Sequence, residues 1–381
     1  MNSFSHYTKA INTAILQNDP RPLIRAFSLE NPPVSPRLNL SRTLPSPWDQ
    51  ILLFHLSAAN SFYSQDYISA YENQAKCLLS YLKVFPTHKR PFLPFIYLLN
   101  NQMISFAIKA DQTLILQGKE PEKAQQAAWN TNKCFSACIT DNISEDDSSR
   151  KWGTYHLACT LFKLYFHLHS FHLCKNIIRA IEASPLPDLS QFSIADQVQY
   201  NYYIGVLFFQ QEKYVKASKH LTFVLENIHY QCKKNRMYLI PTNMVNGILP
   251  NQKLLEKYPT IKNQFFVYIN ALKSGNVKQF DQALQNNQNE HFKNGTYLAM
   301  ERVRLHVLRR FIKKVYLISK TTRIHTDTFV AAFRFMGLVI DGMEVHCILA
   351  NLIHKGFIKG YISESHNTLV LSKADPFPLA T

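Results

Sequence analysis

The stretch DGMEVHCILANLIHKGFIKGYISESHNTLVL, residues 341–371, decides the fold. Asp341 followed by Glu344 is a capping box, in which each residue satisfies a free amide at the start of a helix. Gly356 is a C-cap for this helix, whose apolar residues recur at helical spacing: Val345, Ile348, Leu349 and Leu352. Two short β-type runs follow, 357–362 and 368–371, joined by a polar loop. The stretch therefore predicts a helix and then a β-hairpin.

Two further helices are predicted directly before this stretch. Residues 300–319 carry an apolar stripe at helical spacing, made of Met300, Val303, Val307, Phe311, Val315 and Ile318. Thr326 or Asp327 can cap a second helix, which ends at Gly337. Because three helices followed by a β-hairpin are the order of a winged helix, residues 301–378 are predicted to form one.

Helical periodicity also dominates residues 48–300, with short breaks at prolines and glycines. A string of antiparallel helices is typical of an α-solenoid. One pair fits the tetratricopeptide pattern, with Gly205 and Ala217 where two helices must approach closely. Residues 151–183 are predicted to be strongly helical, and the acidic stretch 142–150 to be an exposed loop.

These patterns predict a mainly α protein, an α-solenoid of tetratricopeptide-like repeats followed by a C-terminal winged helix. Residues 1–47 form the first part, a short helix and then a linker that holds five prolines. Helical repeats occupy residues 48–200, a further helical segment spans 201–300, and the winged helix spans 301–378.

The composition restricts the class of function. The formal net charge is +16, which predicts association with a polyanion: nucleic acid, an acidic membrane surface or an acidic protein. Seven cysteines, with no CxxC pair, favour free buried thiols over disulfides or a zinc ribbon. The sequence shows no signal peptide and no run of about 18 uncharged apolar residues, so we expect a cytoplasmic or nuclear protein.

Catalytic motifs are absent from the sequence. It holds no GxxxxGK[ST], GxGxxG, HExxH or GxSxG pattern, so we expect no enzyme and no cofactor. The histidines near Cys174 are the most suggestive cluster. On a helix, however, His167 and Cys174 share one face while His169 and His172 share another, so four zinc ligands do not converge.

Helical repeats that run directly into a winged helix resemble the PCI domain. This is the scaffold module shared by the proteasome lid, the COP9 signalosome, translation initiation factor three and mRNA-export complexes. A narrower resemblance, to the nuclear mRNA-export branch, rests on residues 238–241 (YLIP), Met244, Gly247, Pro250, 254–259 (LLEKYP), 347–363 (CILANLIHKGFIKGYIS), 369–373 (LVLSK) and 376–378 (PFP). That branch includes the PCI subunit of the transcription-export complex 2 and the COP9 signalosome subunit-twelve-like proteins. The resemblance is specific from about 200 to 378 and elsewhere rests on helical character.

The resemblance implies three kinds of partner. Such proteins bind a small acidic Sem/Dss-type protein along the repeats, and they pair with a larger scaffold PCI protein of the export complex. The joined basic surface then binds RNA or DNA with little sequence preference. We therefore expect a nuclear protein, located in part at the nuclear pore and in part in the cytoplasm, without membrane insertion.

Nucleic-acid binding without sequence choice needs Lys and Arg side chains that neutralise phosphates. The candidates form three groups: Lys233, Lys234 and Arg236; Arg309, Arg310, Lys313 and Lys314; and Lys355 and Lys359. Arg323 and Arg334 extend the second group. The third winged-helix helix offers Glu344, Asn351 and His354 outward, and Glu344 would repel phosphate. Contact with the backbone, or a protein-facing third helix, is therefore favoured over base readout.

Two hypotheses remain. In the first, the chain is a non-enzymatic scaffold subunit that couples transcription to mRNA export and binds nucleic acid through a composite basic surface. In the second, it is a purely architectural PCI subunit of a COP9-signalosome-like or splicing-linked complex, and its basic faces serve protein partners only. The salt dependence of nucleic-acid binding discriminates between them.

Overall fold

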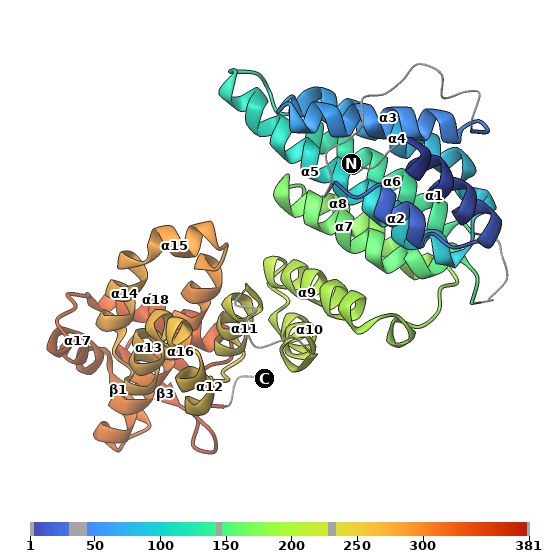
Figure 1. The fold of residues 1–381 in the computed structure, drawn as a ribbon. Helices are drawn as coiled ribbons and strands as arrows, with labels where there is room; N and C mark the ends of the chain where they lie inside the picture. Colours follow the sequence, from blue (N-terminus) through green and yellow to red (C-terminus); the bar gives the residue numbers. More distant parts are fainter. Residues whose placement is uncertain (1–3, 30–43, 142–146, 228–233, 379–381) are drawn as a thin grey trace. The chain divides into compact units, whose positions relative to one another are not determined.

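The computed structural model describes residues 4–29, 44–141, 147–227 and 234–378 (Figure 1). The chain forms two compact units, Met1–Tyr200 and Asn201–Thr381. Both are built mainly from helices, and one small sheet lies near the C-terminus. The predicted fold class, helical repeats followed by a winged helix, is confirmed. The Pro-rich linker and the acidic loop fall largely in 30–43 and 142–146, outside the described residues.

The first unit is a series of antiparallel helices that pack in chain order. Their bounds are α1 Phe4–Gln17, α2 Arg21–Ala26, α3 Trp48–Tyr63, α4 Tyr67–Val84, α5 Leu93–Leu116, α6 Lys123–Ile139, α7 Thr154–His167 and α8 Phe171–Ala183, with short 3₁₀ turns at Phe85–Thr87, Arg90–Phe92, Arg150–Gly153 and Leu189–Gln191. From α3 to α8 each helix contacts the next, as Figure 1 shows. This nearest-neighbour packing is typical of helical repeats.

Residues 151–183 are strongly helical, as predicted, but they form two helices. Helix α7 ends at His167 and α8 begins at Phe171, so His167 and Cys174 do not share one helix. His169 lies between them with a φ of 53°, in the left-handed region, so the backbone reverses direction there. The sequence does not reveal this turn, since residues 168–170 contain neither glycine nor proline.

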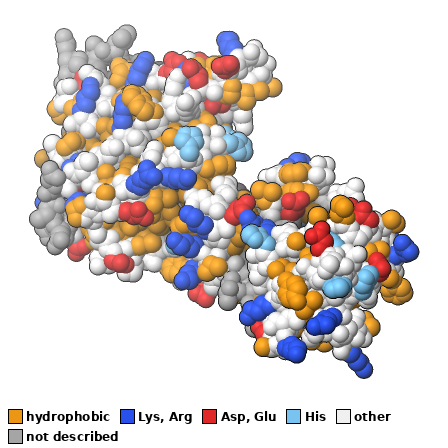
Figure 2. Space-filling view, turned by 180° about the vertical axis from the view of Figure 1, so that it is seen from behind, with side chains coloured by type: hydrophobic (Ala, Val, Ile, Leu, Met, Phe, Trp, Pro, Cys, Tyr) orange, Lys and Arg blue, Asp and Glu red, His pale blue; other side chains and the backbone are white. Residues whose placement is uncertain are grey.

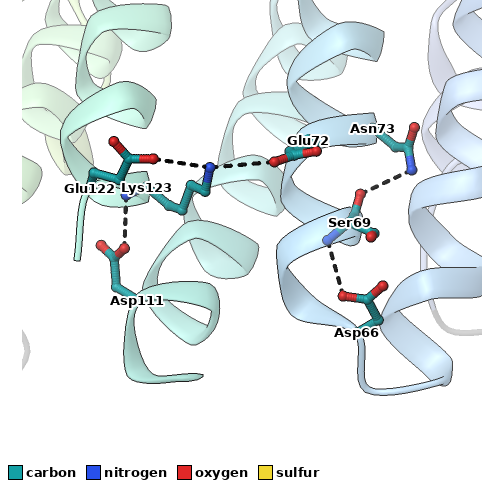
Figure 3. A network of polar contacts seen from close by, with 7 residues as sticks. All are labelled: Asp66, Ser69, Glu72, Asn73, Asp111, Glu122 and Lys123. Carbon is teal, nitrogen blue, oxygen red and sulfur yellow. Dashed lines mark hydrogen bonds and ion pairs between the residues drawn. The ribbon is translucent and has the colours of Figure 1, made fainter. Parts of the chain in front are cut away.

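A buried carboxylate starts one of these helices. Asp111, near the end of α5, accepts a hydrogen bond from the backbone amide of Lys123 at 2.8 Å (Figure 3), and a second one from the amide of Ala124, also at 2.8 Å. These amides belong to the first turn of α6 and have no partner within their own helix. The Nζ of Lys123 lies 3.4 Å from Glu72 of α4, so the contact joins three helices. Capping from a neighbouring helix thus fixes the α5–α6 corner.

The second unit begins within α9. Its helical part comprises α9 Ile194–Gln210, α10 Tyr214–Asn227, α11 Lys234–Val245, α12 Gln252–Lys257, α13 Pro259–Ser274, α14 Val277–Asn286, α15 Gln288–Lys293 and α16 Tyr297–Ser319. Gly205 packs directly on α10, where an added Cβ would lie 2.8 Å from the Leu221 side chain. The close approach predicted at Gly205 is therefore confirmed.

The winged helix completes this unit. It contains β1 Arg323–His325, α17 Thr326–Phe335, α18 Gly342–His354, β2 Gly360–Ser363 and β3 Thr368–Leu371. The sheet is antiparallel in the order β1-β3-β2, with Ile324 opposite Leu369 and Gly360 opposite Leu371. The apolar side of α16 packs against this module, and the ring centroids of Phe311 and Phe333 are 4.5 Å apart.

The details of this module confirm some local predictions and correct others. The capping box of Asp341 and Glu344 is present. The N-cap of α17 is His325 rather than Thr326 or Asp327, and its side chain accepts from the Asp327 amide. Strand β1 was not predicted, because three residues give no periodic signal and the strand exists only through its pairing with β3.

Candidate nucleic-acid interface

The basic surface of the second unit forms where α13 ends against α16. Gly275 adopts a φ of 69°, and a Cβ there would lie 3.1 Å from the backbone nitrogen of Phe311. A glycine therefore lets the two helices approach within backbone contact. The exposed Lys273 of α13 and Arg310 of α16 consequently line one hollow.

Lys314 helps to hold this junction together. Its Nζ donates to the carbonyl oxygen of Ser274 at 2.5 Å, at the C-terminus of α13. A cation at this end of a helix is favoured by the unsatisfied carbonyls there. Lys314 is exposed but already engaged, so it is a weaker candidate for phosphate than the sequence indicated.

Arg309 acts mainly as a clamp on the end of the chain. Its Nη2 donates to the carbonyl oxygens of Phe377 (2.8 Å) and Pro378 (2.6 Å), and its Nε donates to that of Phe357 (3.3 Å). Burial and the neighbouring Arg310 lower the pKa of this guanidinium. Arg309 is half-buried and binds protein carbonyls, which corrects the expectation of an open phosphate contact.

The other candidates differ in exposure. Arg310, Lys355 and Arg323 are exposed and Lys313 is half-buried; in the described part of the chain none of these four side chains has a hydrogen-bond or ion-pair partner. Lys359 is exposed, and its Nζ lies 3.7 Å from Asp375. Because Arg309 bonds to Phe357, the α16 group and the Lys355–Lys359 group lie next to each other.

Of the first predicted group, the structure describes the side chain of Arg236 alone, and this side chain is buried. Arg236 is 2% exposed, and its guanidinium lies 3.6 Å from the centre of the Tyr258 ring, a cation–π contact. A buried guanidinium cannot neutralise a phosphate, so the structure corrects the expectation for Arg236. Lys233 and the side chain of Lys234 lie outside the described residues.

Sequence reasoning missed the part of this surface that α13 supplies. Lys262, Phe266 and Lys273 lie on its outer face, and Phe266 is 44% exposed. Their spacing along the sequence could have revealed a shared helix face. Figure 2 shows exposed hydrophobic side chains among Lys and Arg side chains on the face that it draws. On α13, the exposed ring of Phe266 beside Lys262 and Lys273 is a combination of ring and cations that is typical of single-strand nucleic-acid binding.

Comparison with known proteins agrees with this architecture. Residues 284–373 match the PCI domain family. The chain is 35% identical to the PCI domain-containing protein 2 of Xenopus laevis over 91% of this chain and 88% of the relative. It is 33% identical to the zebrafish (Danio rerio) protein of the same name over 99% of this chain and 98% of the relative. It is also 31% identical to the CSN12 homologue of Schizosaccharomyces pombe over 90% and 85%.

The chain belongs to the PCI-domain family.

The family relationship extends beyond the segment that carried the resemblance. Since the alignments cover about nine-tenths of this PCI protein, they include its first unit as well. PCI-domain proteins are in general non-catalytic scaffold subunits, and the chain fits an architectural subunit of this type. Among the described residues, no helix is both long and apolar enough to cross a membrane.

The third winged-helix helix of the PCI protein presents the predicted outer face. Glu344, Asn351 and His354 are exposed on α18. Met343 is 77% exposed on the same helix, and Cys347 is also exposed. Cys347 thus departs from the expectation of buried thiols, whereas the other described cysteines are buried. This face carries a carboxylate and apolar groups, which does not suit a phosphate backbone.

Proposed function

We propose that this PCI protein is a scaffold subunit of a nuclear mRNA-export complex and binds RNA or DNA without base choice. The observation that carries the proposal is a group of cations on the second unit that have no partner among the described residues, with Arg310 and Lys313 on one helix and Lys355 nearby. In a chain of net charge +16, such a group attracts a phosphate backbone.

The geometry favours backbone contact over base readout. The candidate cations Arg310 and Lys313 belong to α16, whereas the helix that would enter the major groove in a DNA-reading winged helix is α18. Glu344 on that face would repel phosphate. Affinity would therefore come from released counterions and would depend little on base sequence.

Partners follow from the same proposal. The small acidic Sem/Dss-type protein would bind the helical repeats, and a larger scaffold PCI protein would add its own winged helix. The joined basic surface would then be wider than that of this chain alone. We infer a nuclear location, in part at the nuclear pore, because a complex that couples transcription to export acts there.

A second candidate function is an architectural role with protein partners only. One observation favours it: Phe335, Val339 and Met343 are 95%, 94% and 77% exposed around the turn between α17 and α18. Exposed apolar groups that are close together often mark a protein interface. In this alternative, the cations would contact acidic proteins in a COP9-signalosome-like or splicing-linked complex.

Charge reversal tests the proposal. Arg310 and Lys313 are changed to Glu together, while Lys163 and Lys175, two exposed lysines of the first unit, are changed to Glu as a charge-matched control. Fluorescence anisotropy with generic single-stranded RNA and duplex DNA across a salt series should show binding that weakens with salt. The variant with Arg310 and Lys313 changed to Glu should lose most of its affinity for both probes, and the control variant should keep most of its affinity. A folded protein that binds neither probe at low salt would contradict the proposal and favour the architectural role.

A further inference from the structure

Two hollows adjoin along α13, and Lys273 lines both of them. The first, about 410 Å³, lies between the segment after α11, α13 and α16. The second, about 330 Å³, lies between α12 and the outer face of α13. Each is in the size range of sites that take a small ligand or one unit of a longer one.

The first hollow has an apolar floor and a cationic rim. Leu249 and Leu272 supply apolar surface, while Lys273, Arg309 and Arg310 supply charge. The three bonds of Arg309 to carbonyls use its Nε and Nη2, and its Nη1 group has no partner among the described residues. A ligand with a flat apolar part and an anionic part fits this combination.

His306 lines the same hollow but adds no charge to it. Its Nε2 donates to the carbonyl oxygen of Val245 at 2.8 Å, and burial lowers the pKa of the imidazole. The ring is therefore neutral near pH 7, and the charge of the hollow comes from its lysine and arginine side chains.

The second hollow holds the exposed aromatic ring. Phe266 is 44% exposed, and the Nζ of Lys262 lies 5.8 Å from the centre of its ring. One carboxylate, that of Glu256, also lines this hollow and accepts a hydrogen bond from Gln252 at 3.0 Å. An exposed ring beside lysines can stack a nucleic-acid base while the lysines contact the phosphates on either side.

We propose that the two hollows form one site for single-stranded nucleic acid, in which Phe266 stacks a base while Arg310, Lys273 and Lys262 contact phosphates of the same strand. The inference rests on the proposed function and specifies its ligand. A single strand can turn an unstacked base toward a ring in a hollow. In a duplex the bases are already paired and stacked, so the same site would reach only the backbone.

The test compares a labelled oligouridylate of about 12 nucleotides with an RNA duplex of similar length, bound by the full chain. The single strand should bind more tightly. Phe266→Ala should weaken its binding about tenfold with little effect on the duplex, and Phe266→Trp should restore it. Phe292→Ala, which removes another exposed ring of the same unit, is the matched control.

Lys273→Gln gives a second, independent reading. Removal of one phosphate contact should lower the slope of log K against log salt by about 0.7 for the single strand. Both Phe266 and Lys273 are exposed, so circular dichroism should show an unchanged fold.

The outcomes separate this inference from the proposed function. In one outcome, the chain binds the single strand and the duplex equally, Phe266→Ala changes neither affinity, and changing Arg310 and Lys313 to Glu abolishes both. This outcome would overturn the inference and leave the proposed function standing. Absence of binding to either probe would overturn both. A third outcome is that the chain binds poly-glutamate and that Phe266→Ala weakens this binding as much as it weakens RNA binding. That result would also overturn the inference, in favour of an acidic protein ligand.

Discussion

At the scale of single residues, the same type of side chain performs different tasks in this protein. Arg309, Arg310 and Lys314 lie within two helical turns, yet only Arg310 has no protein partner among the described residues. Sequence alone predicted one uniform basic face, because the carbonyls that occupy Arg309 and Lys314 come from distant segments. Likewise, Arg236 is buried against the ring of Tyr258. The sequence around Arg236 gives no sign of this contact, because Tyr258 lies 22 residues further along the chain.

Arg309→Gln should therefore affect stability more than phosphate binding. It removes charge-assisted hydrogen bonds that hold Phe377 and Pro378, each of which contributes on the order of 1.5–3 kcal/mol. Hydrogen exchange should show loss of protection at the Lys359 amide, which donates to Pro376 in the same tail. Arg310→Gln is the control and should leave this protection unchanged. Equal effects of the two variants would contradict the clamp.

A buried histidine should make the first unit sensitive to acid. His55 is 1% exposed, its ring lies 4.4 Å from that of Phe27, and burial lowers its pKa from 6.5 to about 4. The folded state thus binds fewer protons than the unfolded state between these values, so stability rises with pH across that window. As the pH falls from about 6.5 toward 4, the free energy of unfolding decreases by up to about 3 kcal/mol.

Urea unfolding at about pH 7 and about pH 5 measures this dependence. The variant His55→Leu keeps an apolar side chain against Phe27 and removes the titrating group, so its unfolding free energy should change less between the two values. His88, whose pKa burial also lowers to about 4, should leave a residual dependence. An unchanged pH dependence in His55→Leu would contradict this assignment.

At the scale of elements, strong local signals were sufficient for prediction. Helix α18 has a capping box, a regular apolar stripe and Gly356 after its end, so the sequence predicted it correctly. Strand β1 and the turn at His169 lack such signals, since the first needs a distant partner and the second has no breaker residue. The hollows along α13 also escaped prediction, because three separate segments line them.

Gly360→Ala should disrupt the hairpin. A Cβ at this position would lie 2.3 Å from the carbonyl oxygen of Val370, and backbone on the paired strand cannot move without breaking the β2–β3 pairing. We expect a loss of more than about 2 kcal/mol of unfolding free energy. Gly342→Ala is the control, because its Cβ would meet only a methyl group at 3.9 Å and it begins a helix. Urea unfolding that gives the same midpoint for both variants would contradict the prediction.

At the scale of the whole molecule, charge and architecture act together. The net charge of +16 is a property of the entire chain, whereas the unpaired cations that the proposed function uses belong to the second unit. The first unit offers other surfaces, including Trp129, which is 64% exposed. A scaffold that binds protein partners along its repeats and nucleic acid near its winged helix would divide these tasks between the two units.

Photo-crosslinking of the full chain to 4-thiouridine-labelled single-stranded RNA, followed by mass spectrometry of the linked peptides, would locate the bound strand on the protein. We predict crosslinks that are concentrated in α13, α16 and residues 355–359 and that are lost when Arg310 and Lys313 are changed to Glu. Crosslinks confined to the first unit or to the outer face of α18, or none in a folded protein, would contradict it.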